Sequence, residues 1–203
     1  MPASLYARGG KRAFDFVAAL AGLLILAPGL AVVALAIAVL DPGPVFFRQT
    51  RVGLGFKPFR LFKFRTMRAE GGGPDITTGG DARVTPVGRL LRTSKLDELP
   101  QLLNVLAGDM SLVGPRPEVP KYVELFRKDY EVVLSVRPGI TDYAAIEYRD
   151  EESVLKAFAD PEKGYTEKVL PEKIVLYRRY IAEMGVWIDL NIILKTLGKI
   201  AGA

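Results

Sequence analysis

The longest hydrophobic segment of the chain lies near its N-terminus. Residues 16–40, FVAALAGLLILAPGLAVVALAIAVL, carry no charged side chain. At roughly 1.5 Å per residue, this run is long enough as a single helix to cross a hydrocarbon layer of about 30 Å. Pro28 and Gly29 stand at its midpoint, where a proline removes a backbone donor and clashes with the preceding turn. A break there leaves two arms of about a dozen residues, near 18 Å each, and neither arm would span alone.

Basic residues flank this segment on both sides. They are Arg8, Lys11 and Arg12 before it, and Arg48, Arg51, Lys57, Arg60, Lys63, Arg65 and Arg68 after it. Because basic flanks mark the cytoplasmic side of a membrane segment, both ends are predicted to be cytoplasmic. The pattern favours a re-entrant helix-break-helix over a kinked spanning helix or a cleaved signal peptide. Residues 1–41 then form a basic N-terminus with the membrane helix, and residues 42–203 form a cytoplasmic domain.

The pattern changes to alternation after residue 44. The runs VFFRQTRVG and FKPFRLFKFRTM interleave aromatic and basic residues and are separated by Gly53-Leu54-Gly55, which predicts a small β-hairpin. Alternation places Phe62 and Phe64 on one face of the second strand, with Lys63 and Arg65 on the other. A basic face beside a membrane indicates an anionic partner, although a solvated strand face in contact with lipid headgroups gives the same pattern.

Helical spacing dominates the rest of the chain. The residues EGGGPDITTGGD, 70–81, predict a mobile surface loop, and Thr85 is expected to cap a short helix that begins at Pro86. Further helices are expected near residues 122–126, 175–180 and 186–200, the last one amphipathic and packed on the core or a membrane surface. The predicted class is α+β: a mainly helical monotopic membrane protein with a re-entrant segment, a small β-hairpin and amphipathic interfacial helices.

Composition narrows the chemistry that is available. The 203 residues contain no histidine and no cysteine, so disulfides, thiolate nucleophiles, imidazole bases and the usual zinc sites are excluded. Acid-base or nucleophilic work is left to carboxylates, lysine, tyrosine or hydroxyl groups. The 28 Lys and Arg residues outnumber the 23 Asp and Glu residues, giving a net charge of +5, which favours phosphate groups, an anionic membrane surface or nucleic acid as partner.

Two adjacent acids, Asp97 and Glu98, stand at the predicted start of a helix that ends at Gly108. Either Ser94 or Asp97 is expected to cap this helix, and Pro100 favours the later start. Acids in the first turn are ordinarily only a favourable partner of the helix dipole, but a helix N-terminus also attracts metal-bound phosphates. The following Gly-Pro-Arg-Pro corner holds Arg116 on a rigid support.

An ordered set of motifs resembles a known family. KRAFDF before the apolar run, the Pro28 break, FKPFRLFKFRTM, RLLRTSKLDELPQLLNVLAGDMSLVGPRP, VRPGIT and WIDLNII together are similar to the monotopic phosphoglycosyl transferases, also called bacterial sugar transferases. The resemblance implies transfer of a phosphosugar from a nucleoside diphosphate sugar, a UDP-sugar, to a polyprenol phosphate such as undecaprenyl phosphate, with release of UMP and with Mg²⁺ as cofactor. It places the protein at the cytoplasmic face of a bacterial inner membrane, in contact with lipid and without nucleic acid, at the first membrane step of glycan assembly.

The resemblance also implies residue roles. Asp97 is expected to be the nucleophile that forms an aspartyl-phosphosugar intermediate, Glu98 its partner, and both are candidate ligands of Mg²⁺. Four basic residues match positions where the family binds phosphates: Lys63, Arg92, Arg116 and Arg149. Mg²⁺ needs only one or two carboxylates besides the substrate phosphates, so the acid pair alone can hold it. A homodimer is a further partner to be considered.

The chain departs from the family pattern at three places. Asp142-Tyr143 follows VRPGIT where the family has Gly-Trp, Glu147-Tyr148 replaces an Asn-Gly, and Ala27 precedes Pro28 where relatives have serine. The first two changes bear on which sugar is bound and on the role of Arg149. Two other functions remain to be compared: a membrane-anchored protein that binds anionic lipid or nucleic acid, and a structural scaffold in which the acid pair only caps a helix.

Overall fold

The structure is a computed structural model that describes residues 6–68, 77 and 80–202. Most of the expected glycine-rich loop, 70–81, lies outside the described residues. The N-terminal half contains η1 (Tyr6–Gly10), α1 (Lys11–Leu40), β1 (Phe46–Val52), η2 (Leu54–Phe56), β2 (Pro58–Phe64), α2 (Pro86–Ser94), η3 (Leu96–Glu98) and α3 (Gln101–Ala107). The C-terminal half contains β3 (Ser111–Val113), α4 (Pro120–Leu125), α5 (Arg127–Val133), β4 (Gly139–Thr141), α6 (Tyr143–Glu147), α7 (Glu151–Lys156), α8 (Pro161–Gly164), η4 (Tyr165–Val169), α9 (Leu170–Glu183) and α10 (Val186–Ala201).

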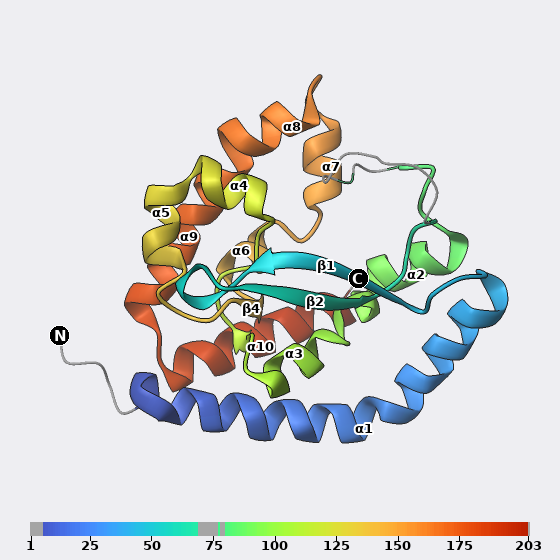
Figure 1. Cartoon of the computed structure of the whole chain (residues 1–203), viewed down its shortest axis with the longest axis horizontal. Helices are drawn as coiled ribbons and strands as arrows, with labels where there is room; N and C mark the ends of the chain where they lie inside the picture. Colours follow the sequence, from blue (N-terminus) through green and yellow to red (C-terminus); the bar gives the residue numbers. More distant parts are fainter. Residues whose placement is uncertain (1–5, 69–76, 78–79, 203) are drawn as a thin grey trace.

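The apolar segment forms one continuous helix, α1, with Pro28 inside it. Figure 1 shows α1 running along one side of the molecule and then changing direction. A proline inside a helix lacks one N–H and clashes with the preceding turn, so it bends a helix without ending it. The expected interruption is therefore a bend. By length and composition, α1 is the one helix among the described residues that is able to cross a membrane.

Both ends of α1 lie against the rest of the protein. On the N-terminal side of Pro28, Ala19 packs with Leu102 and Val105 of α3. On the C-terminal side, Ile37 packs with Phe64 of β2 and Leu91 of α2. Between these contacts the helix exposes large apolar side chains, among them Leu20, Leu24, Ile25, Val32 and Leu35.

The expected β-hairpin is confirmed, with β1 and β2 antiparallel and Phe46 opposite Phe64. Its outer edge is held by a side chain of α3. Asn104, fully buried, accepts a hydrogen bond from the Phe62 N–H (3.0 Å) and donates one to the Arg60 carbonyl (2.8 Å). Asn104 thus takes the place of a third strand, and it fixes α3 beside β2.

A second, parallel pair joins β3 to β4 in register Ser111↔Gly139 and Val113↔Thr141. Two glycines make this approach feasible: a Cβ on Gly139 would lie 2.0 Å from the Gly114 nitrogen, and one on Gly114 would lie 2.5 Å from the Arg137 carbonyl oxygen. The motifs Val-Gly-Pro-Arg-Pro and Arg-Pro-Gly-Ile-Thr are therefore the two sides of one contact. Behind it, the largest core cluster joins α4, α5, η4 and α9 around Tyr122, Tyr130, Tyr165 and Tyr177.

The helical predictions hold except at the caps. Thr85 accepts a hydrogen bond from the Gly88 N–H at 3.0 Å, as expected. The prediction that Ser94 or Asp97 caps the next helix is wrong. The Ser94 hydroxyl donates to the Leu90 carbonyl at the end of α2, and neither η3 nor α3 has a side-chain cap. Lys95 adopts a left-handed conformation (φ 57°) and starts a separate short turn that carries Asp97.

Candidate functional site

The acid pair lies on η3, between α2 and α3. Asp97 is only 7% exposed, and its Oδ1 is buried without a hydrogen-bond partner. Burial raises the pKa of the Asp97 carboxyl and the Glu98 charge adds to this, while Lys63 opposes it. Because a buried polar atom without a partner is rare in a folded protein, this oxygen is a candidate to bind something the protein alone does not supply.

Glu98 is held by two cations from distant segments. The Lys63 Nζ of β2 lies 3.0 Å from Oε1. The Arg116 guanidinium donates to Oε1 at 2.6 Å and to Oε2 at 3.1 Å, a two-pronged pair that fixes the carboxylate plane. Burial alone would raise the pKa of the Glu98 carboxyl, but Arg116 and Lys63 together hold it well below its usual range. Glu98 is therefore a fixed anion at neutral pH.

The pKa values of the two cations in this cluster, Arg116 and Lys63, are also shifted. The Glu98 carboxylate raises the pKa of Arg116 well above its ordinary value. Burial lowers the pKa of the Lys63 ammonium, and Glu98 opposes that shift. The structure thus brings together four of the six residues proposed from sequence for the chemistry or for phosphate binding: Asp97, Glu98, Lys63 and Arg116.

Arg92 and Arg149 are arranged differently. Arg92 projects from α2 onto Glu152 of α7, with Nε 3.0 Å from Oε1, and its Nη1 lies 3.4 Å from the Thr66 hydroxyl. Its charge still acts to lower the pKa of Asp97. Arg149 is half-buried in the turn between α6 and α7, and among the described residues it makes no ion pair with either acid.

A buried polar cluster that sequence reasoning missed anchors the start of α1. Asp189 of α10, fully buried, accepts hydrogen bonds from Lys11 (2.5 Å), Tyr6 (2.6 Å) and Tyr180 (2.8 Å). Asp15 accepts one from the Leu112 N–H at 3.1 Å. Lys11 and Asp15 belong to the KRAFDF motif and Asp189 to the WIDLNII motif, and this membership was their sequence signal.

Arg12 completes this anchor at the end of α3. Its guanidinium donates to the carbonyls of Val105 (2.5 Å) and Leu106 (3.0 Å), which belong to the last turn of that helix. A cation is favourable there because the last carbonyls of a helix lack partners. KRAFDF therefore fixes α1 to the helix that follows the acid pair.

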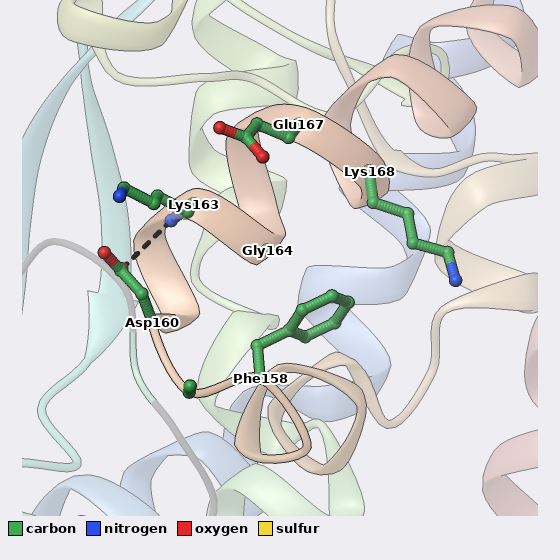
Figure 2. Close-up of a pocket in the computed structure, with 7 residues that line it drawn as sticks. Phe158, Asp160, Lys163, Gly164, Glu167 and Lys168 are labelled. Atoms are coloured by element: carbon green, nitrogen blue, oxygen red, sulfur yellow. Dashed lines mark hydrogen bonds between the residues drawn. The ribbon is translucent and has the colours of Figure 1, made fainter.

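A separate hollow of about 520 Å³ is lined by the loop that follows α7, by α8 and by η4. Figure 2 shows Phe158 beneath it, with Asp160, Lys163 and Glu167 around its rim. None of the six proposed residues lines it. The unpartnered oxygen of Asp97, rather than this hollow, is therefore the feature that marks the chemistry.

Of the two acids at this site, only one has an oxygen available to bind a hard divalent cation. The Asp97 oxygen is unpartnered, and Mg²⁺ requires only one or two carboxylates plus phosphate oxygens. Both Glu98 oxygens already accept hydrogen bonds from cations. Asp97 is thus the acid that the arrangement leaves available to a metal.

Comparison with known proteins identifies the family of this chain. Residues 6–203 match the family of bacterial sugar transferases. The chain belongs to this family. Among curated bacterial sugar transferases, it is 42% identical over 194 residues to the UDP-glucose:undecaprenyl-phosphate glucose-1-phosphate transferase of Caulobacter vibrioides, covering 92% of this chain and 68% of the relative.

Two further relatives are longer. The protein of the same name in Escherichia coli K12 is 40% identical over 195 residues, which cover 93% of this chain but 39% of the relative. The UDP-N-acetylgalactosamine-undecaprenyl-phosphate N-acetylgalactosaminephosphotransferase of Aeromonas hydrophila is 36% identical over 207 residues, covering 98% and 45%. The chain thus spans less than half the length of these two bacterial sugar transferases.

Proposed function

We propose that this bacterial sugar transferase moves a phosphosugar from a UDP-sugar to a polyprenol phosphate, undecaprenyl phosphate in particular. The observation that carries the proposal is the buried, unpartnered Asp97 oxygen beside the Glu98, Lys63 and Arg116 cluster. The names of the relatives support the two substrates. They differ in the sugar, so the sugar transferred by this chain is left open.

The reaction proceeds by two displacements at one phosphorus atom. An Asp97 carboxylate oxygen attacks the sugar-bearing phosphorus of the UDP-sugar, the bond from that phosphorus to the bridging oxygen breaks, and UMP leaves with the bond's electron pair. A phosphate oxygen of the polyprenol phosphate then attacks the same phosphorus and releases the Asp97 carboxylate. A carboxylate is a competent covalent nucleophile when the phosphate charge is neutralised. Lys63 and Arg116 are placed to supply that neutralisation.

A bound Mg²⁺ would supply further neutralisation of the diphosphate and would hold it in line. Asp97 is the residue that fits it, for the reason given above. Glu98 serves the cluster as the fixed anion that keeps Lys63 and Arg116 in place. Arg92, paired with Glu152 and near Asp97, is the next cation available to a phosphate.

We place the protein at the cytoplasmic face of the inner membrane, with α1 re-entrant. Lys11 at one end of α1 contacts Asp189, and Arg65 holds the carbonyls of Asp41 and Pro42 just after the other end. A helix of 30 residues is about 45 Å long, so a straight span would carry one of these ends to the opposite surface. These two contacts support a helix that enters and leaves on the same side.

The test is UMP release from a panel of UDP-sugars by purified protein with Mg²⁺, with and without undecaprenyl phosphate. The proposal expects acceptor-dependent release that is lost in Asp97→Asn and retained in Asp160→Asn, a change at an exposed helix-capping aspartate. Release that persists in Asp97→Asn would overturn the assigned nucleophile. No release from any donor by folded wild-type protein would favour the lipid-binding alternative.

A further inference from the structure

Asp142 joins the corner that carries Arg116 to the start of α6. It is 1% exposed. One carboxylate oxygen, Oδ1, accepts a hydrogen bond from the Ala145 N–H at 2.6 Å and so caps α6. The other, Oδ2, accepts one from the Arg116 N–H at 3.1 Å. The side chain thus bridges two segments that are 26 residues apart.

No other backbone N–H of the Pro115-Arg116-Pro117 segment is able to replace this hydrogen bond. Pro115 and Pro117 lack an N–H, so Arg116 carries the only backbone donor between them. The neighbouring bonds of this corner, from Gly139 N–H to the Pro115 carbonyl (2.9 Å) and from Gly114 N–H to the Thr141 carbonyl (3.0 Å), hold the chain before Arg116. The contact with Asp142 continues this series to the arginine itself.

Charged and polar side chains surround the Asp142 carboxyl and hold it in place. Asp142 is flanked by the Arg116 charge and by the Lys173 ammonium of α9, which is itself paired with Glu151 at 2.7 Å. The Tyr177 hydroxyl of α9 is buried nearby without a partner. Desolvation is the largest effect and raises the pKa of Asp142 to about 6, while the two N–H donors and the two cations oppose it.

We propose that Asp142 is a positioning residue for the transfer reaction: it fixes the Arg116 backbone so that the guanidinium meets Glu98 in a two-pronged geometry. The inference rests on the proposed function for its kinetic consequence. It also assigns a role to a residue that departs from the family pattern. Asp142 acts through Arg116 rather than on the sugar.

The test uses Asp142→Ser and Asp142→Asn in the full chain. Serine is a good helix cap but has one short hydroxyl, so it keeps the bond to Ala145 and releases Arg116. Asparagine keeps the shape and replaces one acceptor oxygen by an amide NH₂. The matched control is Asp160→Ser, because Asp160 caps α8 through the Glu162 and Lys163 N–H groups at 3.1 Å and faces solvent.

Misplacement of a catalytic group by a fraction of an ångström to 1 Å lowers the rate by on the order of 10- to 100-fold. We expect kcat for UMP release to fall by that factor in Asp142→Ser, with KM for the UDP-sugar changed less, and to stay unchanged in Asp160→Ser. In an Arg116→Ala background the same serine substitution is expected to have little further effect, because the group through which it acts is gone. Full additivity of the two substitutions, or an unchanged kcat, would overturn the proposal.

A second measurement does not depend on turnover. Amide hydrogen exchange in a peptide containing residues 112–119 is expected to speed up in Asp142→Ser and not in Asp160→Ser. If the wild type releases no UMP but this exchange speeds up, the proposed function fails while the anchoring of Arg116 stands. If exchange is unchanged, the anchoring itself is refuted.

Discussion

Asp97, the proposed nucleophile, has a carboxylate whose burial lowers the stability of the folded protein. A charged carboxylate with an unpartnered, buried oxygen destabilises the folded state, and a neutral amide of the same shape removes that charge. We expect Asp97→Asn to lower UMP release by at least about a thousandfold and to leave the melting temperature in detergent equal to or above that of the wild type. Thermal unfolding followed by circular dichroism, alongside the activity assay, measures both. A clear fall in melting temperature would mean that Asp97 is a structural residue.

The raised pKa of Asp142 predicts how the free energy of unfolding changes with pH. Its pKa in the folded protein is about 6, above the ordinary value of 3.8, so the folded state binds the proton more tightly than the unfolded chain. The contribution of Asp142 to the free energy of unfolding should therefore decrease as pH rises from about 4 to 6, and stay low above that. Arg116 and Tyr177 also face the carboxylate, and they do not titrate in this window because the pKa of each is raised well above its ordinary value.

The measurement is the melting temperature of wild type and Asp142→Asn between pH 5 and pH 7.5. The difference, wild type minus variant, is expected to shrink or become more negative as pH rises. A difference that grows with pH would contradict a raised pKa of Asp142 in the folded protein.

At the scale of single residues, the sequence predicted the two acids and Arg116 as site residues, but it did not predict which side chains they bind. Asp97-Glu98 and the Pro-Arg-Pro corner are local patterns that can be read from consecutive residues. The partners of these groups, Lys63 for Glu98, Glu152 for Arg92 and Asp142 for Arg116, come from 26 to 60 residues away in the chain. Neither spacing nor charge in the sequence specifies such pairs.

At the scale of elements, strong periodicity gave reliable predictions and short elements did not. The hairpin follows from alternation, and α10 from helical spacing. The parallel pair β3–β4 has three residues per strand, too few to show a period, and its close approach depends on Gly114 and Gly139. The acid pair was expected to begin a helix, whereas the left-handed Lys95 gives it a turn of its own.

The proposed re-entrant arrangement of α1 can be tested at two positions flanking it. The chain contains no cysteine, so a single cysteine placed at Gly9 or at Lys57, both exposed, is a unique label site. In intact spheroplasts, we expect both sites to be protected from a membrane-impermeant maleimide and both to react after permeabilisation. Reaction of only one site in intact spheroplasts would place the two ends of α1 on opposite sides and refute the re-entrant model.

At the scale of the molecule, exposed apolar side chains gather over α1, α3 and α10. Figure 1 shows these three helices together on one side of the hairpin. Besides the side chains of α1, Leu103 of α3 and Trp187, Leu194 and Leu197 of α10 are exposed, Trp187 by 79%. Of the two surfaces expected for this amphipathic helix, the core or a membrane, Trp187 does not face the core. Large exposed apolar side chains on neighbouring helices indicate an interaction site, and an exposed tryptophan among them is typical of a membrane interface.

Trp187 is the only tryptophan in the chain, so its fluorescence reports directly on this surface. In vesicles whose acyl chains carry bromine, we expect strong quenching of the emission and weak quenching by aqueous acrylamide, because the ring lies at the boundary of the hydrocarbon.

The control is Trp187→Phe combined with Val175→Trp, which moves the reporter to a position 66% exposed on α9, a helix that packs on α5, α6 and η4. That variant should show the reverse pattern, quenched by acrylamide and not by bromine. Equal bromine quenching at both positions would mean that the lipid-facing surface is not the one formed by α1, α3 and α10.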